Sequence, residues 1–179
     1  MRYAVVLLAV GVMLPAQTRS RKAHEHGSAK VSIAFEAATG MPKGAIEFEA
    51  PAESVVGFEY EAKSAADKAK VAAALKTLTA RFGEMVILPA ASGCKLTNKS
   101  AKVEAEHHDA KSKEQHSEVH AEFDVVCAKP LSGTEIRFGF MKVFPKIHDV
   151  DVTLLVGEQQ SKADVENDKG VLKLSLIHI

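Results

Sequence analysis

Eight histidines stand in this chain of 179 residues, and six of them fall in two short clusters. The first cluster is the segment HEHG, and the second lies between Glu104 and Phe123. Imidazole nitrogens and carboxylate oxygens are common ligands of zinc. The clusters therefore indicate metal binding, with candidate ligands His24, His26, His107, His108, Asp109, His116 and His120. The other two histidines, His148 and His178, stand alone and are interpreted as solvated side chains.

Spacing decides which of these side chains can share an ion. On an extended chain, residues two apart face the same side and lie roughly 6.5–7 Å apart. His24 and His26 can therefore turn toward one ion. His116 and His120 would lie about 13 Å apart on a strand, too far to share one. If that strand begins at Ser117, His116 can fold back toward the histidines before it. The alternative interpretation is a solvated, charged loop whose histidines titrate near neutrality.

Motifs of common enzyme classes are absent from the sequence. It contains no G-x-S-x-G, no phosphate-binding glycine loop, no HExxH and no C-x-x-C. A hydrolytic zinc enzyme needs a fixed site with an open coordination position, and a segment rich in lysine, glutamate and serine excludes little water. The chain also carries 23 basic and 23 acidic residues. We therefore expect neither an enzyme nor a partner of nucleic acid.

The first residues are typical of an export signal. Arg2 precedes an apolar run from Tyr3 to Ala16, and a more polar QTRSRK follows. The run is too short to span a membrane as a helix, and the sequence has no second one. We expect residues 1–18 to be a signal peptide, cleaved between residues 16 and 20, and the product to have no stable membrane anchor.

Export changes how the two cysteines are interpreted. Two cysteines in an oxidising compartment usually pair, so we expect a disulfide between Cys94 and Cys127. They lie nearly equally far from the middle of the second histidine cluster. A hairpin with that cluster at its tip would bring them opposite each other. The apolar residues change parity between Leu96 and Val103, so the hairpin needs a bulge.

The remaining patterns predict strands around one long helix. Alternation before and after TGMPKG indicates two antiparallel strands, and VVGFEY is predicted to continue as extended chain. Ser64 is a plausible helix N-cap, and Gly83 a plausible stop. After Pro130 we expect a strand and then a short helix ending before Pro145. The predicted fold class is α+β, an antiparallel β-sheet with one long helix and a His-rich hairpin tip. Residues 19–30 would form a histidine-containing N-terminal segment, and 31–179 a single zinc-binding domain.

Several segments together resemble one family. They are AHEHGSAKVSIAFE, IEFEAPAESVVGFEYEAKSAADKAKVAAAL, LPAASGCKL, HSEVHAEFDVVCAKP and VFPKIHDVDV. In order and wording they are similar to the ZrgA-type periplasmic zinc-uptake proteins of Gram-negative bacteria, formerly a domain of unknown function. The opening His-x-His-Gly of the family matches His24, His26 and Gly27, its cysteines match Cys94 and Cys127, and its histidine tract matches the second cluster.

The resemblance implies a periplasmic protein that binds zinc and assists a high-affinity zinc ABC importer. Zinc is therefore the expected ion. Copper and nickel remain open, because copper(II) generally binds nitrogen and oxygen ligands more tightly than zinc does. The other open alternative is an envelope interaction domain whose histidines have no specific metal function.

Overall fold

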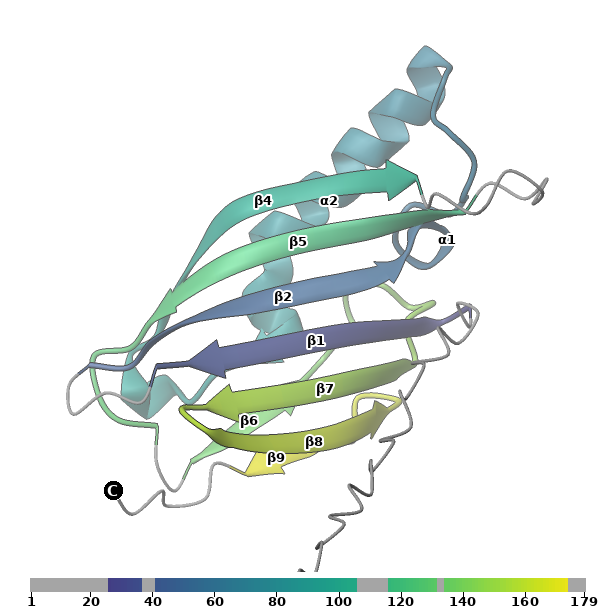
Figure 1. Cartoon of the computed structure of the whole chain (residues 1–179). Coiled ribbons are helices and arrows are strands. Elements are labelled where there is room, and N and C mark those ends of the chain that lie inside the picture. Colours follow the sequence, from purple (N-terminus) through teal and green to yellow (C-terminus); the bar gives the residue numbers. More distant parts are fainter. Residues whose placement is uncertain (1–25, 37–40, 106–115, 132–133, 174–179) are drawn as a thin grey trace, which may run out of the picture.

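A computed structural model describes residues 26–36, 41–105, 116–131 and 134–173 of the chain. Its largest element is a six-stranded sheet with the strand order β4-β5-β2-β1-β7-β8 (Figure 1). The strands are β1 Ser28–Phe35, β2 Lys43–Pro51, β4 Lys95–Ala105, β5 Ser117–Val126, β7 Asp149–Val156 and β8 Gln159–Glu166. Neighbouring strands run antiparallel except β1 and β7, which are parallel. The predicted α+β class with a mostly antiparallel sheet is confirmed.

One face of this sheet is covered and the other faces outward. Helix α2 and a small sheet of β3 (Val86–Ile87), β6 (Glu135–Phe138) and β9 (Val171–Lys173) lie behind it (Figure 1). Alternation places the apolar residues inward. In β5, for example, Val119, Ala121, Phe123 and Val125 are buried, while the residues between them are partly or fully exposed. The core therefore lies between the large sheet and the elements behind it.

Helix α2 spans Ala65–Met85 and packs on the sheet through aromatic rings. The Ser64 hydroxyl accepts a hydrogen bond from the Asp67 N–H, which confirms the predicted N-cap. The ring of Phe82 stacks on that of Phe123 with a centroid separation of 3.8 Å. The prediction that Gly83 ends the helix is wrong. Two further residues stay helical, because this brings Met85 into the core beside Phe82.

Two other local predictions are also wrong. Part of the segment VVGFEY is not extended, because Ala52–Val55 forms the short helix α1 and the next turn ends at Gly57, whose φ is 100°. The short helix expected before Pro145 is a series of turns in which the N–H groups of Val143 and Phe144 bond the Phe140 carbonyl. Burial of several side chains in that short segment favours turns over a regular helix.

The predicted hairpin and disulfide are both present. Strands β4 and β5 pair from Lys95 and Val126 to Ala105 and Ser117, with a register shift between Asn98 and Ser100. This irregularity is the bulge that the parity of the sequence required. The Cys94–Cys127 disulfide closes the hairpin at its base. The tip, with His107, His108 and Asp109, lies outside the described residues.

Within the described ranges, no helix is long and apolar enough to cross a membrane.

Candidate metal centre

Three chain segments meet at one end of the large sheet (Figure 1). They are the residues just before β1, the stretch that contains α1, and the residue just before β5. His26 Nδ1 lies 2.6 Å from Glu53 Oε2 and 3.5 Å from Glu59 Oε1. His116 Nδ1 lies 2.6 Å from the other oxygen of Glu59. One potential ligand atom from each of His26, Glu53 and Glu59 lies within 4.8 Å of the other two. We use the term metal centre for this candidate site, which comprises the group His26, Glu53 and Glu59 together with His116 beside Glu59.

Gly27 holds His26 in place. Its N–H donates to the buried Ser54 hydroxyl on α1 at 3.1 Å. Its carbonyl accepts the N–H groups of His148 and Asp149, at 3.0 and 3.2 Å. The φ of Gly27 is 86°, and a Cβ atom there would lie 2.3 Å from His148 Nε2. Only glycine fits this position, and its hydrogen bonds set His26 against α1.

The two carboxylates come from one short stretch after β2. Strand β2 ends at Pro51, and Glu53 stands in the first turn of α1. Gly57 then redirects the chain, and the Glu59 carbonyl accepts a hydrogen bond from the Ser117 hydroxyl at 2.6 Å. This bond ties the loop to the start of β5, next to His116. The Glu59 side chain is 14% exposed, so the centre has one largely buried carboxylate.

A neighbouring cation lowers the pKa of Glu53 below its usual value. Lys146 Nζ donates to Glu53 Oε1 at 2.8 Å. This hydrogen bond is the main cause that lowers the pKa of Glu53, and the charges of Lys146 and His26 add to it, against a rise from desolvation. A carboxylate that remains charged at neutral pH is a ready cation ligand. His26 is 66% exposed, so an ion can approach this side of the centre from solvent.

The donor set fits zinc. Two imidazoles and two carboxylates are nitrogen and oxygen ligands that zinc accepts. Zinc bonds of about 2.0–2.1 Å in a tetrahedron place ligand atoms about 3.3 Å apart. The nitrogen–oxygen distances of 2.6–3.5 Å bracket this value. These distances cover the pairs His26–Glu53, His26–Glu59 and His116–Glu59. The ligand atoms of His26, Glu53 and Glu59 lie close enough together to hold one ion, while His116 stands outside this group of three and contacts the second oxygen of Glu59.

His120 belongs to a different group. It points outward from β5, with ring nitrogens 3.4 Å from a Glu118 oxygen, 3.7 Å from Glu49 and 3.9 Å from Glu104. His116 instead contacts Glu59. The structure thus brings together His26 and His116 from the predicted ligands and places His120 apart from them. His24, His107, His108 and Asp109 lie outside the described residues.

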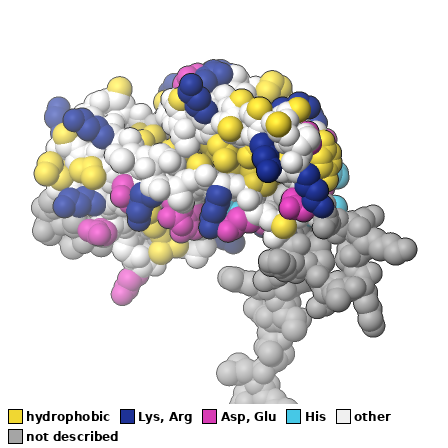
Figure 2. All heavy atoms as spheres, turned by 90° about the horizontal axis from the view of Figure 1, so that it is seen from above, with side chains coloured by type: hydrophobic (Ala, Val, Ile, Leu, Met, Phe, Trp, Pro, Cys, Tyr) yellow, Lys and Arg dark blue, Asp and Glu magenta, His cyan; other side chains and the backbone are white. Residues whose placement is uncertain are grey.

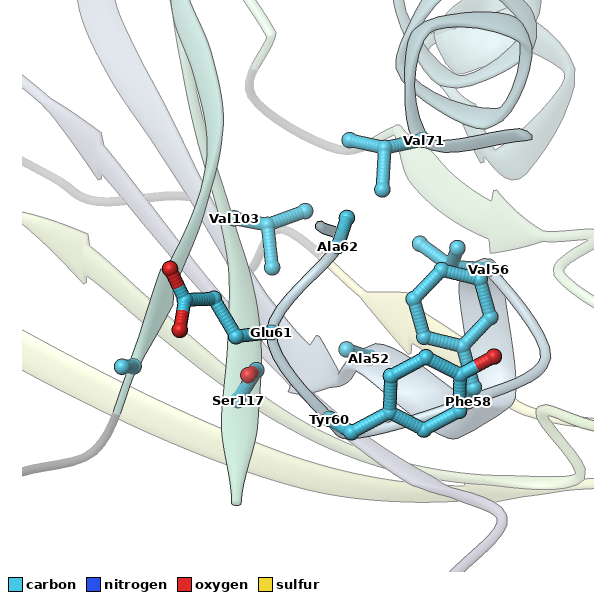
Figure 3. Close-up of a pocket in the computed structure, with 10 residues that line it drawn as sticks. Ala52, Val56, Phe58, Tyr60, Glu61, Ala62, Val71, Val103 and Ser117 are labelled. Atoms are coloured by element: carbon cyan, nitrogen blue, oxygen red, sulfur yellow. The ribbon is translucent and has the colours of Figure 1, made fainter. Parts of the chain in front are cut away.

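Figure 3 shows a small, mostly apolar pocket, whose lining includes Ala52, Phe58, Tyr60 and Ser117, the chain neighbours of Glu53, Glu59 and His116. Residues alternate along the loop, so that Phe58 and Tyr60 line the pocket while Glu59 contacts the histidines. The two aromatic rings stack with a centroid separation of 4.4 Å. The pocket has a volume of about 250 Å³ and is lined by Ala52, Val56, Phe58, Tyr60, Glu61, Ala62, Val71, Val103, Ala105 and Ser117. Histidine side chains reach the surface at this same end of the molecule (Figure 2).

An α+β domain with histidines and carboxylates gathered at one end of its sheet has the features of a cation-binding protein. The family comparison is consistent with this class. The model of the ZrgA family, described as zinc uptake proteins, matches residues 23–174, and the chain belongs to this family. The name indicates a role in zinc uptake and not an enzyme family. A search of curated proteins finds no match to the chain.

Sequence reasoning missed two residues of the centre, Glu53 and Glu59. Both lie in the stretch EAPAESVVGFE, whose glutamates have no metal-ligand spacing that the sequence alone reveals. The signal that could have found them is their position after the strand that pairs with β1, because this pairing returns the chain to the histidine segment.

Proposed function

We propose that the chain is an exported, periplasmic zinc-binding protein that captures zinc at the metal centre and passes it to, or buffers it for, an ABC importer. The observation that carries this proposal is the contact of His26 with both Glu53 and Glu59, and of His116 with Glu59. In this proposal residues 1–18 are the signal peptide, 19–30 the histidine-containing segment and 31–179 the single zinc-binding domain.

Two features support export. The Cys94–Cys127 disulfide suits an oxidising compartment, since disulfides are rare where cytosolic reductants act. The apolar run at the start of the sequence suits a cleaved signal. An exported zinc-binding protein would meet the ion before it reaches an importer in the inner membrane.

The exposed side of the centre supports transfer over permanent storage. Structural zinc sites are closed, with four protein ligands shielded from water. Here His26 is 66% exposed and is the ligand that can leave first. Tract residues His107, His108 and Asp109 would add further ligands, as would His24 beside His26. His120, surrounded by three glutamates, would bind a second ion more weakly.

Zinc titration by calorimetry tests the metal centre. Zinc affinity is measured in two backgrounds. One is the unsubstituted protein, and the other is a variant in which Gln replaces His24, His107 and His108. In the second background, Glu59→Gln is expected to lower zinc affinity by at least about tenfold, because it removes the carboxylate that contacts both histidines. Glu84→Gln is the matched control, since Glu84 pairs with Arg81 on α2.

The outcomes separate the alternatives. No zinc uptake by the unsubstituted protein at micromolar concentrations near neutral pH would overturn the zinc proposal and favour the envelope interaction domain. Uptake that Glu59→Gln leaves unchanged would move the site away from the metal centre. Competition with copper and nickel in the same titration measures selectivity. Poorer growth under zinc chelation in cells that lack the protein, restored by added zinc, would support the importer role.

A further inference from the structure

Lys146 lies against the metal centre without being a metal ligand. It stands in the turn before β7, and its Nζ bonds Glu53 Oε1 at 2.8 Å. The other oxygen of Glu53, Oε2, lies 2.6 Å from His26 Nδ1. The two oxygens of this carboxylate are therefore divided between a fixed cation and the face on which a metal ion would bind.

The backbone that positions His26 also positions Lys146. Ile147, the next residue, is fully buried, and its N–H bonds the Phe144 carbonyl at 2.9 Å. His148 follows and donates its N–H to the Gly27 carbonyl at 3.0 Å. Lys146 is thus anchored one residue from a buried side chain and two residues from the bond to the histidine segment. The ammonium group approaches Glu53 from a defined direction.

We propose that Lys146 sets the metal selectivity of the centre by restricting Glu53 to one ligating oxygen. This inference rests on the proposed function. One ligand atom each from His26, Glu53 and Glu59 lies within 4.8 Å of the other two, and a turn of the His116 ring, which contacts Glu59, would supply a fourth. Four is the coordination number that zinc favours in proteins. Calcium takes about six to eight oxygens, often from bidentate carboxylates, and manganese favours oxygen-rich octahedral sites.

The ammonium group disfavours bidentate binding in two ways. It occupies a lone pair of Oε1, and it repels a divalent ion that would approach the same oxygen. Removing it frees the second oxygen of Glu53 and allows a higher coordination number. The loss therefore favours manganese or calcium relative to zinc. Lys146 is 55% exposed, so its ion pair contributes little to folding stability and its replacement leaves the domain folded.

Cobalt(II) spectroscopy and zinc–manganese competition test this role. Both are measured in the variant without His24, His107 and His108, with Lys146→Met, Lys146→Arg or Lys142→Met added. Lys142→Met is the matched control, because it removes the same charge from an exposed residue of the preceding turn, near Glu84. Cobalt(II) absorbs visible light strongly when four-coordinate and weakly when six-coordinate, so its spectrum reports the ligand number.

Lys146→Met is expected to weaken the visible cobalt bands and to lower the zinc-to-manganese affinity ratio by about tenfold. Lys146→Arg retains a donor to Oε1 and is expected to keep both the spectrum and the ratio, as is Lys142→Met. Equal loss of zinc and manganese affinity in Lys146→Met, with an unchanged cobalt spectrum, would show a merely structural role and overturn the proposal. Absence of cobalt and zinc binding before Lys146 is changed would instead overturn the proposed function.

Discussion

Breaking the Cys94–Cys127 disulfide should destabilise the domain without weakening its metal centre. The bond joins residues 33 apart in sequence. The chain-entropy relation gives about 3.7 kcal/mol at 25 °C for a loop of this length, because the bond limits the unfolded chain. The centre lies at the other end of the hairpin, since β5 runs ten residues from Ser117 beside the centre to Val126 beside the disulfide. Ten residues of strand span about 33 Å.

Urea unfolding at neutral pH measures the loss of stability. The double substitution of Cys94 and Cys127 by alanine should lower the free energy of unfolding by about 3.7 kcal/mol. Reduction of the unsubstituted protein is the matched control, because it breaks the same bond and keeps both side chains. Zinc affinity, measured by calorimetry on the folded alanine variant, should stay unchanged; the reduced protein is left out of this measurement, because its two free thiols are themselves zinc ligands. A loss below about 1 kcal/mol would refute the entropic argument. A parallel fall in zinc affinity would refute the separation of the two ends.

Two further substitutions test other parts of the structure. Gly27→Ala should lower zinc affinity in calorimetry and cost at least about 1–2 kcal/mol in urea unfolding, because its Cβ would meet His148 and its φ is 86°; unchanged affinity would contradict the role of Gly27 in placing His26. The pKa of Asp151 is raised from 3.8 by burial first and then by Asp164 and Asp149. A carboxyl group whose pKa is raised by folding makes its full contribution to stability below its unfolded-state pKa. This contribution is lost as the pH rises through the folded-state pKa. Asp151→Asn should therefore be more stable than the unsubstituted protein near pH 7, with the difference gone below about pH 3.8 in urea unfolding.

The sequence predicted those elements that depend on interactions between residues close together in the chain. The Ser64 cap with Asp67 and the alternation of Val119 to Val125 depend on neighbours in sequence, and both are present. The end of helix α2, in contrast, depends on packing against the rest of the domain. Gly83 can stop a helix, but Met85 is buried only if the helix continues for two more residues. Burial of a methionine side chain outweighs the cost of a glycine inside a helix, which is about 1 kcal/mol.

Strand partners could not be predicted in the same way. Alternation reveals which residues of a strand face inward, and it does not reveal which strand lies next to it. The pairing of β1 with β2 was accessible, because a short glycine- and proline-rich turn joins them. The parallel pairing of β1 with β7 joins Ser28 to Asp149 across most of the chain. It creates the contact between Gly27 and His148, and so it brings Lys146 to the metal centre.

The candidate metal centre shows why the sequence pointed to its histidines and not to its glutamates. Histidine is scarce enough for a cluster to be noticed, and this is how His26 and His116 became candidate ligands; that they bind a metal stays a prediction. Glutamate is common along the chain, on β2, β4 and β5 among other places, so Glu53 and Glu59 carry no signal by composition. Their significance comes from the antiparallel pairing of β1 and β2, which returns the stretch EAPAESVVGFE to His26 and Gly27 at the start of β1. These two stretches also carried the family resemblance. In the structure they meet in space: the Gly27 N–H donates to the Ser54 hydroxyl, and Glu53 and Glu59 contact His26.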